Sequence, residues 1–163
     1  MEGVKNALLI VWHSRTGASE AMASAAQEGA GGAGRLMRAC EVAAADLLDA
    51  RGYLFVGPEN LAGLSGEMKE MFDRTYYAVL GKIEGRPYAT AIAAGSDGEG
   101  AERQVDRIAT GWRLRRVAGG LIVNTQSQSP EEILAPKAIT EEQRRLCVEL
   151  GASLAEGMRL GIF

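Results

Sequence analysis

The chain has 163 residues, of which 47% are hydrophobic and 24% are charged. This composition is typical of a globular protein and excludes a disordered or fibrous chain. The length suits a single domain over residues 1–163. Eighteen basic residues against 21 acidic ones give a formal net charge of −3, so we expect no broad cationic surface for nucleic acid.

The amino-terminal segment carries only a short apolar run before His13 and Arg15. Because a signal peptide or a membrane span needs a longer run, we expect a cytoplasmic protein without a membrane span. Cys40 and Cys147 lie far apart, outside any C-x-x-C pair or histidine cluster. We therefore expect two buried free thiols, no disulfide and no metal site.

Apolar runs of strand length alternate with helical patterns from the start of the chain. Residues 7–12 read ALLIVW, which predicts a central strand covered on both faces. An alanine-rich stretch over residues 16–28 predicts the first helix. Gly29, Gly31 and Gly34 match the letters of a G-x-G-x-x-G fingerprint, but they follow a helix and precede a strand. That order is the reverse of a dinucleotide site, so we interpret them as a helix stop and a turn.

The alternation continues to the end of the chain. Residues 53–57 (YLFVG) form the strongest of the later strand patterns, and Thr140 with Gln143 forms a T-x-x-Q capping box that opens the last helix. A short acidic and apolar segment surrounds Asp46. The predicted strands are 35–40, 53–57, 88–95 and 117–124, and the predicted later helices are 65–76, 101–114 and 140–158.

Strands that alternate with helices favour right-handed crossovers and a doubly wound parallel sheet. In such sheets ligands bind in the crevice beyond the carboxyl ends of the strands. The chain shows no internal repeat or linker that would divide it. We therefore expect one α/β domain with its site at that edge of the sheet.

The segment after the first predicted strand reads HSRTGAS over residues 13–19. Unpaired backbone N–H groups at a helix start can hold a phosphate without any lysine, and the hydroxyls of Ser14, Thr16 and Ser19 would add donors. An ordinary helix N-cap is an equally good interpretation, because serine and threonine are favoured there for stability.

Two other kinds of phosphate site would need residues that the chain lacks at the ends of these strands. A Walker loop needs glycine, lysine and a hydroxyl residue in succession after the strand, and the chain has no such sequence there. A phospho-acceptor regulator would need an aspartate at the end of a central strand. The strands here end in Trp12-His13 and Val56-Gly57 instead.

Two regions resemble a known family. Ser14-x-Thr16-Gly17-x-Ser19 resembles the S/T-x-T-G-x-S/T phosphate loop of flavodoxin-like proteins. The letters GPEN at 57–60, with SG-x-MK and FDR over 65–74, are similar to the G-x-P-x…SG-x-x-K-x-F-x-DR region of flavin and quinone reductases. The resemblance spans the chain from Leu8 to Asn124.

This resemblance implies a flavodoxin-like, five-stranded parallel sheet in the order 2-1-3-4-5, with helices on both faces and flavin mononucleotide (FMN) between strands one and three. Three segments would hold it: the phosphate loop, a loop along the isoalloxazine ring, and a loop at its pyrimidine end. These residues are, in turn, Ser14, Arg15, Thr16, Gly17, Ala18 and Ser19; Pro58, Glu59, Asn60, Leu61, Ala62 and Gly63; and Gly95, Ser96, Asp97, Gly98 and Gly100.

The last of these loops has two interpretations. Its three glycines would let the backbone approach a ligand closely, yet Ser96-Asp97-Gly98 is also typical of a solvent-exposed turn. No catalytic residue and no metal ligand is predicted, because the flavin carries the redox chemistry.

The resemblance leaves reductase, electron carrier and binding module open. Carrier flavodoxins sandwich the ring between aromatic side chains, but the segments PENLAGLSG and GSDGEG contain none. We expect one ring face to stay open for NAD(P)H as donor and a quinone or flavin as acceptor. A net charge of −3 is also mild for a carrier that docks by electrostatic steering. A flavodoxin-type electron carrier, or a module without turnover, is the alternative, and self-association stays open.

Three further features are assigned provisional roles. His13, the only histidine, is interpreted as a hydrogen-bond partner beside the phosphate loop rather than as a catalyst. Arg15 either pairs with the phosphate or faces solvent. Residues 126–137 form a long connection with two prolines, which predicts part of the pocket rim or an interface.

Overall fold

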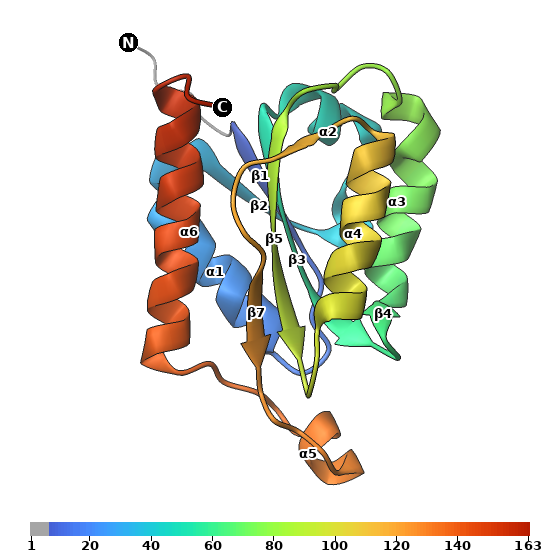
Figure 1. Ribbon diagram of the computed structural model, residues 1–163, viewed down its shortest axis with the longest axis vertical. Coiled ribbons are helices and arrows are strands. Elements are labelled where there is room, and N and C mark those ends of the chain that lie inside the picture. The colour runs from blue at the N-terminus through green and yellow to red at the C-terminus, as the bar shows by residue number, and fades with distance from the viewer. Residues whose placement is uncertain (1–6) are drawn as a thin grey trace.

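In the computed structural model, which describes residues 7–163, a mainly parallel sheet carries helices on both faces (Figure 1). The strands are β1 (Leu8–Trp12), β2 (Gly34–Arg38), β3 (Gly52–Asn60), β4 (Gly63–Leu64), β5 (Pro87–Ala94), β6 (Arg115–Arg116) and β7 (Leu121–Asn124). The helices are α1 (Ala18–Ala30), α2 (Ala44–Asp49), α3 (Gly66–Val79), α4 (Glu99–Gly111), α5 (Pro130–Leu134) and α6 (Glu141–Arg159), with short turns η1 (Gly31–Ala33) and η2 (Ala39–Glu41).

The strand order confirms the predicted fold class. The sheet runs β2-β1-β3-β5, and both β6 and β7 pair with β5 in parallel. β6 and β7 together occupy the place of the predicted fifth strand, so the order is the expected 2-1-3-4-5. The addition is β4, which pairs antiparallel with the end of β3. The expected site edge therefore lies where β1 and β3 end.

Two apolar layers sandwich the sheet. α1 and α6 pack on one face, and α2, α3 and α4 pack on the other (Figure 1). All five residues of β1 are buried, as its unbroken apolar run predicts. The core thus fixes the carboxyl end of β1, and with it the start of α1.

Glycines set the distance between α1 and α6. A Cβ at Gly29 would lie 1.9 Å from the carbonyl oxygen of Val148, and a Cβ at Gly151 would lie 1.9 Å from that of Ala26. Gly29 is therefore inside α1 and serves this packing, so its predicted place in a helix stop was wrong. Gly31, in a left-handed conformation (φ 57°), is the C-cap as predicted.

Two other predictions are corrected. Cys40 is exposed on η2, and only Cys147 is buried, because η2 turns away from the sheet directly after β2. The strand predicted over residues 117–124 is found only in its second half, as β7, while the two-residue strand β6 precedes it and residues 117–120 are not in a strand.

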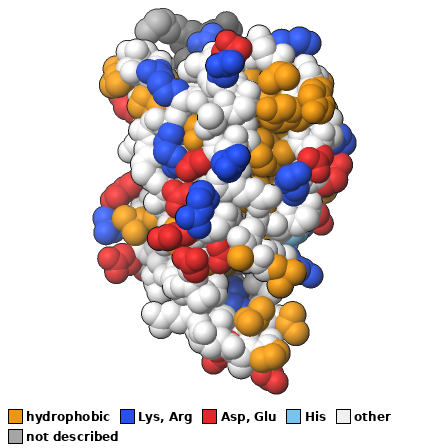
Figure 2. Space-filling model, turned by 45° about the vertical axis from the view of Figure 1, so that its right-hand side comes forward, with side chains coloured by type: hydrophobic (Ala, Val, Ile, Leu, Met, Phe, Trp, Pro, Cys, Tyr) orange, Lys and Arg blue, Asp and Glu red, His pale blue; other side chains and the backbone are white. Residues whose placement is uncertain are grey.

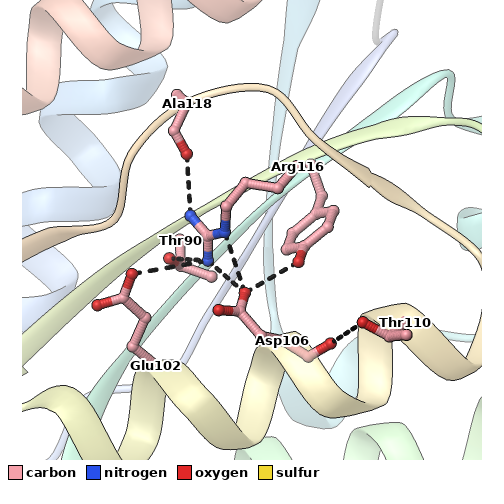
Figure 3. Close-up of polar contacts among 7 residues, drawn as sticks. Thr90, Glu102, Asp106, Thr110, Arg116 and Ala118 are labelled. Atoms are coloured by element: carbon pink, nitrogen blue, oxygen red, sulfur yellow. Dashed lines mark hydrogen bonds and ion pairs between the residues drawn. The ribbon is translucent and has the colours of Figure 1, made fainter.

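Arg116 ends β6, and its side chain sits in a polar network beside β5 and α4 (Figure 3). The guanidinium donates to Thr90 Oγ1 at 2.7 Å, to Asp106 Oδ1, and to the carbonyl oxygen of Ala118 at 3.0 Å. Burial raises the pKa of Tyr88 to about 12, and the hydrogen bond that Tyr88 donates to Asp106 adds to this. The bond to Ala118 links the network to the segment between β6 and β7.

Within residues 7–163, no helix is long and apolar enough to span a membrane, and no cluster of three metal-ligating side chains occurs. The prediction that the chain has no signal peptide rests partly on residues 1–6. These residues lie outside the described part of the chain.

Arg116→Ala is expected to lower the free energy of unfolding by about 2 kcal/mol, because it leaves Asp106 and the Ala118 carbonyl without their charged donor. Arg115→Ala is the matched control, since Arg115 is exposed on the same strand and should cost less than about 0.5 kcal/mol. Urea denaturation measures both. Equal losses in the two variants would contradict the role given to the network.

Candidate functional site

A cavity of about 350 Å³ lies at the carboxyl edge of the sheet. Its walls come from the segment between β1 and α1, the end of β3, the end of β5, and residues 125–137. These are the ends of the central strands and the connection after the last one. The cavity is therefore at the crevice where doubly wound sheets bind ligands.

The segment between β1 and α1 leaves helix donors free on the cavity side. Gly17 is the N-cap of α1 with φ 113°, a left-handed conformation that suits glycine, and its N–H donates to Ser14 Oγ at 2.9 Å. Among the described residues, no acceptor is found for the amides of Ala18, Ser19 and Glu20. These amides stand at the positive end of the helix dipole.

Ser19 adds a further donor without a partner. Its side chain lines the cavity, the residue is only 1% exposed, and within residues 7–163 its Oγ has no hydrogen-bond partner. A buried hydroxyl without a partner costs about 1–3 kcal/mol. Together with the free amides of α1, it forms an arrangement that an anion of phosphate size would satisfy.

The start of α4 is occupied by a carboxylate of the chain itself. Glu59, at the end of β3, accepts hydrogen bonds from the amides of Gly98 at 3.0 Å, Gly100 at 3.1 Å and Ala101 at 3.3 Å. It therefore neutralises the dipole of α4 in the way that an external anion would. The start of α4 is thus filled from within the chain, whereas no side chain among residues 7–163 fills the start of α1.

The predicted ring loop is a tight hairpin rather than an open loop. β3 continues through Pro58 to Asn60 and returns as β4. Leu61 and Ala62 form the turn with φ of 50° and 65°, and the side chain of Leu61 is fully exposed. The hairpin is fixed to α4 by Gln104, whose Oε1 accepts from the amide of Leu64 at 2.7 Å.

Gly98 and Gly100, at the start of α4, allow close contacts within the protein, and an approach to a ligand at these glycines stays a prediction. A Cβ at Gly100 would lie 2.1 Å from the carbonyl oxygen of Ala62, and a Cβ at Gly98 would lie 2.7 Å from a methyl carbon of Ile122. Ser96 and Asp97 are exposed, as the solvent-turn interpretation predicts.

The structure brings about half of the predicted site residues together around the cavity. Those that line it are Ser14, Arg15, Thr16, Ala18, Ser19, Pro58, Glu59, Asn60 and Gly95. Those outside its lining are Gly17, Leu61, Ala62, Gly63, Ser96, Asp97, Gly98 and Gly100. Of the three predicted segments, the phosphate loop thus has the largest share of its residues in the cavity lining.

His13 lies below the phosphate segment and is buried. Its Nδ1 is 2.8 Å from Ser65 Oγ, and its Nε2 is 3.3 Å from a carboxylate oxygen of Glu67. Burial lowers its pKa, the charges of Arg15 and Arg38 add to this, and Glu67 opposes it. The histidine links β1 to the start of α3, which agrees with its predicted role as a hydrogen-bond partner.

The connection after β7 also contributes to the site. Thr125, Ser127, Ile133, Leu134 and Lys137 line the cavity. Their identities were not predicted, but the length and the two prolines of residues 126–137 had marked the segment as rim or interface. Among the described residues, no aromatic side chain lines the cavity.

Comparisons with known proteins show the fold. No family model matches the chain, and no curated protein matches its sequence. Among solved structures, a flavodoxin from the domain Archaea matches with a TM-score of 0.73 and 18% identity, over 91% of this chain and 96% of that one. A WrbA-like flavodoxin from Agrobacterium tumefaciens matches with a TM-score of 0.73 and 16% identity, over 94% and 97%.

A larger protein contains a similar unit. Rubredoxin:oxygen oxidoreductase from Desulfovibrio gigas matches with a TM-score of 0.74 and 14% identity, over 99% of this chain and 38% of that one. At these identities the matches establish a flavodoxin-like fold.

Ser19→Ala is expected to raise the unfolding free energy of the ligand-free protein by about 1 kcal/mol, because it removes a buried hydroxyl without a partner. Ser127→Ala is the control. Ser127 is a buried serine of the same cavity, and its Oγ has a partner in Thr125 Oγ1 at 3.0 Å, so its loss should cost about 1 kcal/mol. The two variants should shift the denaturation midpoint in opposite directions. A destabilising Ser19→Ala would show that the hydroxyl has a partner in the free protein.

Proposed function

We propose that the chain is a cytoplasmic flavoprotein that binds FMN and passes electrons from NAD(P)H to a quinone or flavin acceptor. The observation that carries the proposal is the Ser19 hydroxyl, which has no partner within residues 7–163 and lies beside three amides at the start of α1 that also have none there. A buried group without a partner in a cavity calls for a ligand that supplies acceptors. A phosphate monoester has them.

The residues fit a mononucleotide phosphate. The hydroxyls of Ser14, Thr16 and Ser19 and the amides at the start of α1 would hold it, as the resemblance to the flavodoxin phosphate loop implies. Glu59 supports the choice of a mononucleotide over a dinucleotide, because it already fills the start of α4. A second phosphate group near Glu59 would meet a negative charge.

The remaining walls suit the flat, largely apolar part of the cofactor. Pro58, Ala93 and Ala94 line the cavity beside the polar group of Asn60. When bound, FMN supplies the capacity to accept and give a hydride or electrons, and the protein supplies orientation and access.

The absence of aromatic side chains among the described lining residues favours a reductase over a carrier. An aromatic stacked on the ring would compete with a nicotinamide donor for the same face. Hydride transfer needs close and oriented contact between donor and flavin. The small side chains of Ala93 and Ala94 leave room for such contact.

We expect the purified protein to retain FMN, which denaturation should release for identification by mass. Thr16→Glu should abolish retention in a folded protein, because its carboxylate would repel the phosphate at the start of α1. Thr16→Gln has the same bulk without the charge, and it should retain most of the affinity.

Reductase activity has a separate test. We expect the parent protein to reduce a quinone when NADH or NADPH is supplied as the electron donor.

Each part of the proposal has its own contrary result. Recovery of an adenine dinucleotide would contradict the mononucleotide, and equal FMN affinity in Thr16→Glu and Thr16→Gln would contradict the phosphate position. A parent that holds FMN but consumes neither NADH nor NADPH would contradict the reductase and favour the carrier.

A further inference from the structure

α5 carries two large apolar side chains at the mouth of the cavity. Ile133 is 50% exposed and Leu134 is 75% exposed, and both line the cavity. α5 lies beyond the carboxyl end of β7, apart from the main layers (Figure 1). Hydrophobic side chains stand on the surface at this end of the molecule (Figure 2). Neighbouring exposed aliphatic residues next to a cavity indicate a surface that contacts a ligand when one binds.

Local contacts hold α5 in shape. Ser129 and Glu132 form a capping box, in which Ser129 Oγ accepts from the Glu132 amide and the Glu132 carboxylate accepts from the amides of Gln128 and Ser129. These backbone bonds lower the pKa of Glu132. Pro130 fixes the first helical residue. These contacts stabilise the five-residue helix from within its own segment.

Lys137 closes the other end of α5 and joins it to the phosphate segment. Its Nζ donates to the carbonyl oxygens of Ile133 at 3.1 Å, Ala135 at 2.7 Å and Glu132. Its backbone amide donates to the Thr16 carbonyl oxygen at 2.7 Å. Lys137 therefore fixes the position of α5 relative to the start of α1.

Apart from α5, the apolar side chains that line the cavity are small, and they are those of Ala18, Pro58, Ala93 and Ala94. The hairpin after β3 points Leu61 to solvent, and the turn before α4 is polar and exposed at Ser96 and Asp97. Within the described part of the chain, Ile133 and Leu134 are the large aliphatic side chains of the cavity lining. An apolar ring bound there gains burial chiefly against α5.

We propose that α5 covers the cofactor site, where Ile133 and Leu134 provide apolar contact with one face of the flavin ring system and leave the other face open to the donor. This inference rests on the proposed function and adds to it a set of retaining residues outside the loops implied by the resemblance. It also makes Lys137 a positioning residue, because its bonds set where α5 lies relative to the phosphate segment.

The test compares two double variants of matched exposure. Ile133→Ser/Leu134→Ser removes the cover, and Leu160→Ser/Ile162→Ser removes residues that are 54% and 67% exposed near the carboxyl terminus, at the opposite end of the molecule (Figure 1). FMN affinity is measured by quenching of flavin fluorescence. We expect the first variant to bind about tenfold or more weakly than the parent, since it loses apolar burial. The control should bind like the parent.

Stability and release rate complete the experiment. Because all four residues are exposed, urea denaturation of the ligand-free proteins should give unfolding free energies close to the parent's. Weaker binding should come with faster FMN release in stopped-flow measurements. If the parent binds FMN and Ile133→Ser/Leu134→Ser binds it as tightly, the cover is refuted and the proposed function stands. A parent without FMN binding would refute both.

Discussion

The free helix start of α1 is the constraint on which the site depends. β1 is buried along its whole length between two helical layers, so the core fixes the point at which the chain leaves the sheet. Gly17 then turns the chain in a left-handed conformation into α1. Within residues 7–163, this leaves three amides and the Ser19 hydroxyl without partners. The first amides of every α-helix lack a partner within the helix, so the buried Ser19 hydroxyl is the group that calls for a bound acceptor.

The two helix starts near the cavity show opposite solutions to the same electrostatic problem. At α4, Glu59 supplies the anion from within the chain, and Gly98 and Gly100 let the hairpin and the helix approach. At α1, residues 7–163 supply no carboxylate. This asymmetry supports the proposal of a single phosphate at the start of α1. It follows from the sequence only when the hairpin is folded, because Glu59 reaches α4 across 39 residues.

The parts of the molecule that could be predicted are those set by local pattern. The buried run at β1, the helix after it and the capping box at Thr140 are all found, because apolar periodicity and cap chemistry act within a few residues. The gap between β6 and β7 and the exposure of Cys40 could not be predicted, because they depend on long-range contacts and on how a turn meets the sheet. Ile133 and Leu134 belong to no sequence motif. Their place near the phosphate segment could not be predicted, because only the fold brings them there.

The central claim is that the start of α1 holds the phosphate of a flavin mononucleotide. Its most direct test is a titration of the ¹⁵N-labelled, ligand-free protein with FMN and, separately, with riboflavin, which lacks the phosphate. The account predicts that FMN shifts the amide signals of Ala18, Ser19 and Glu20 strongly and that riboflavin does not. Equal shifts of these three amides with both ligands, or binding of neither, would contradict it.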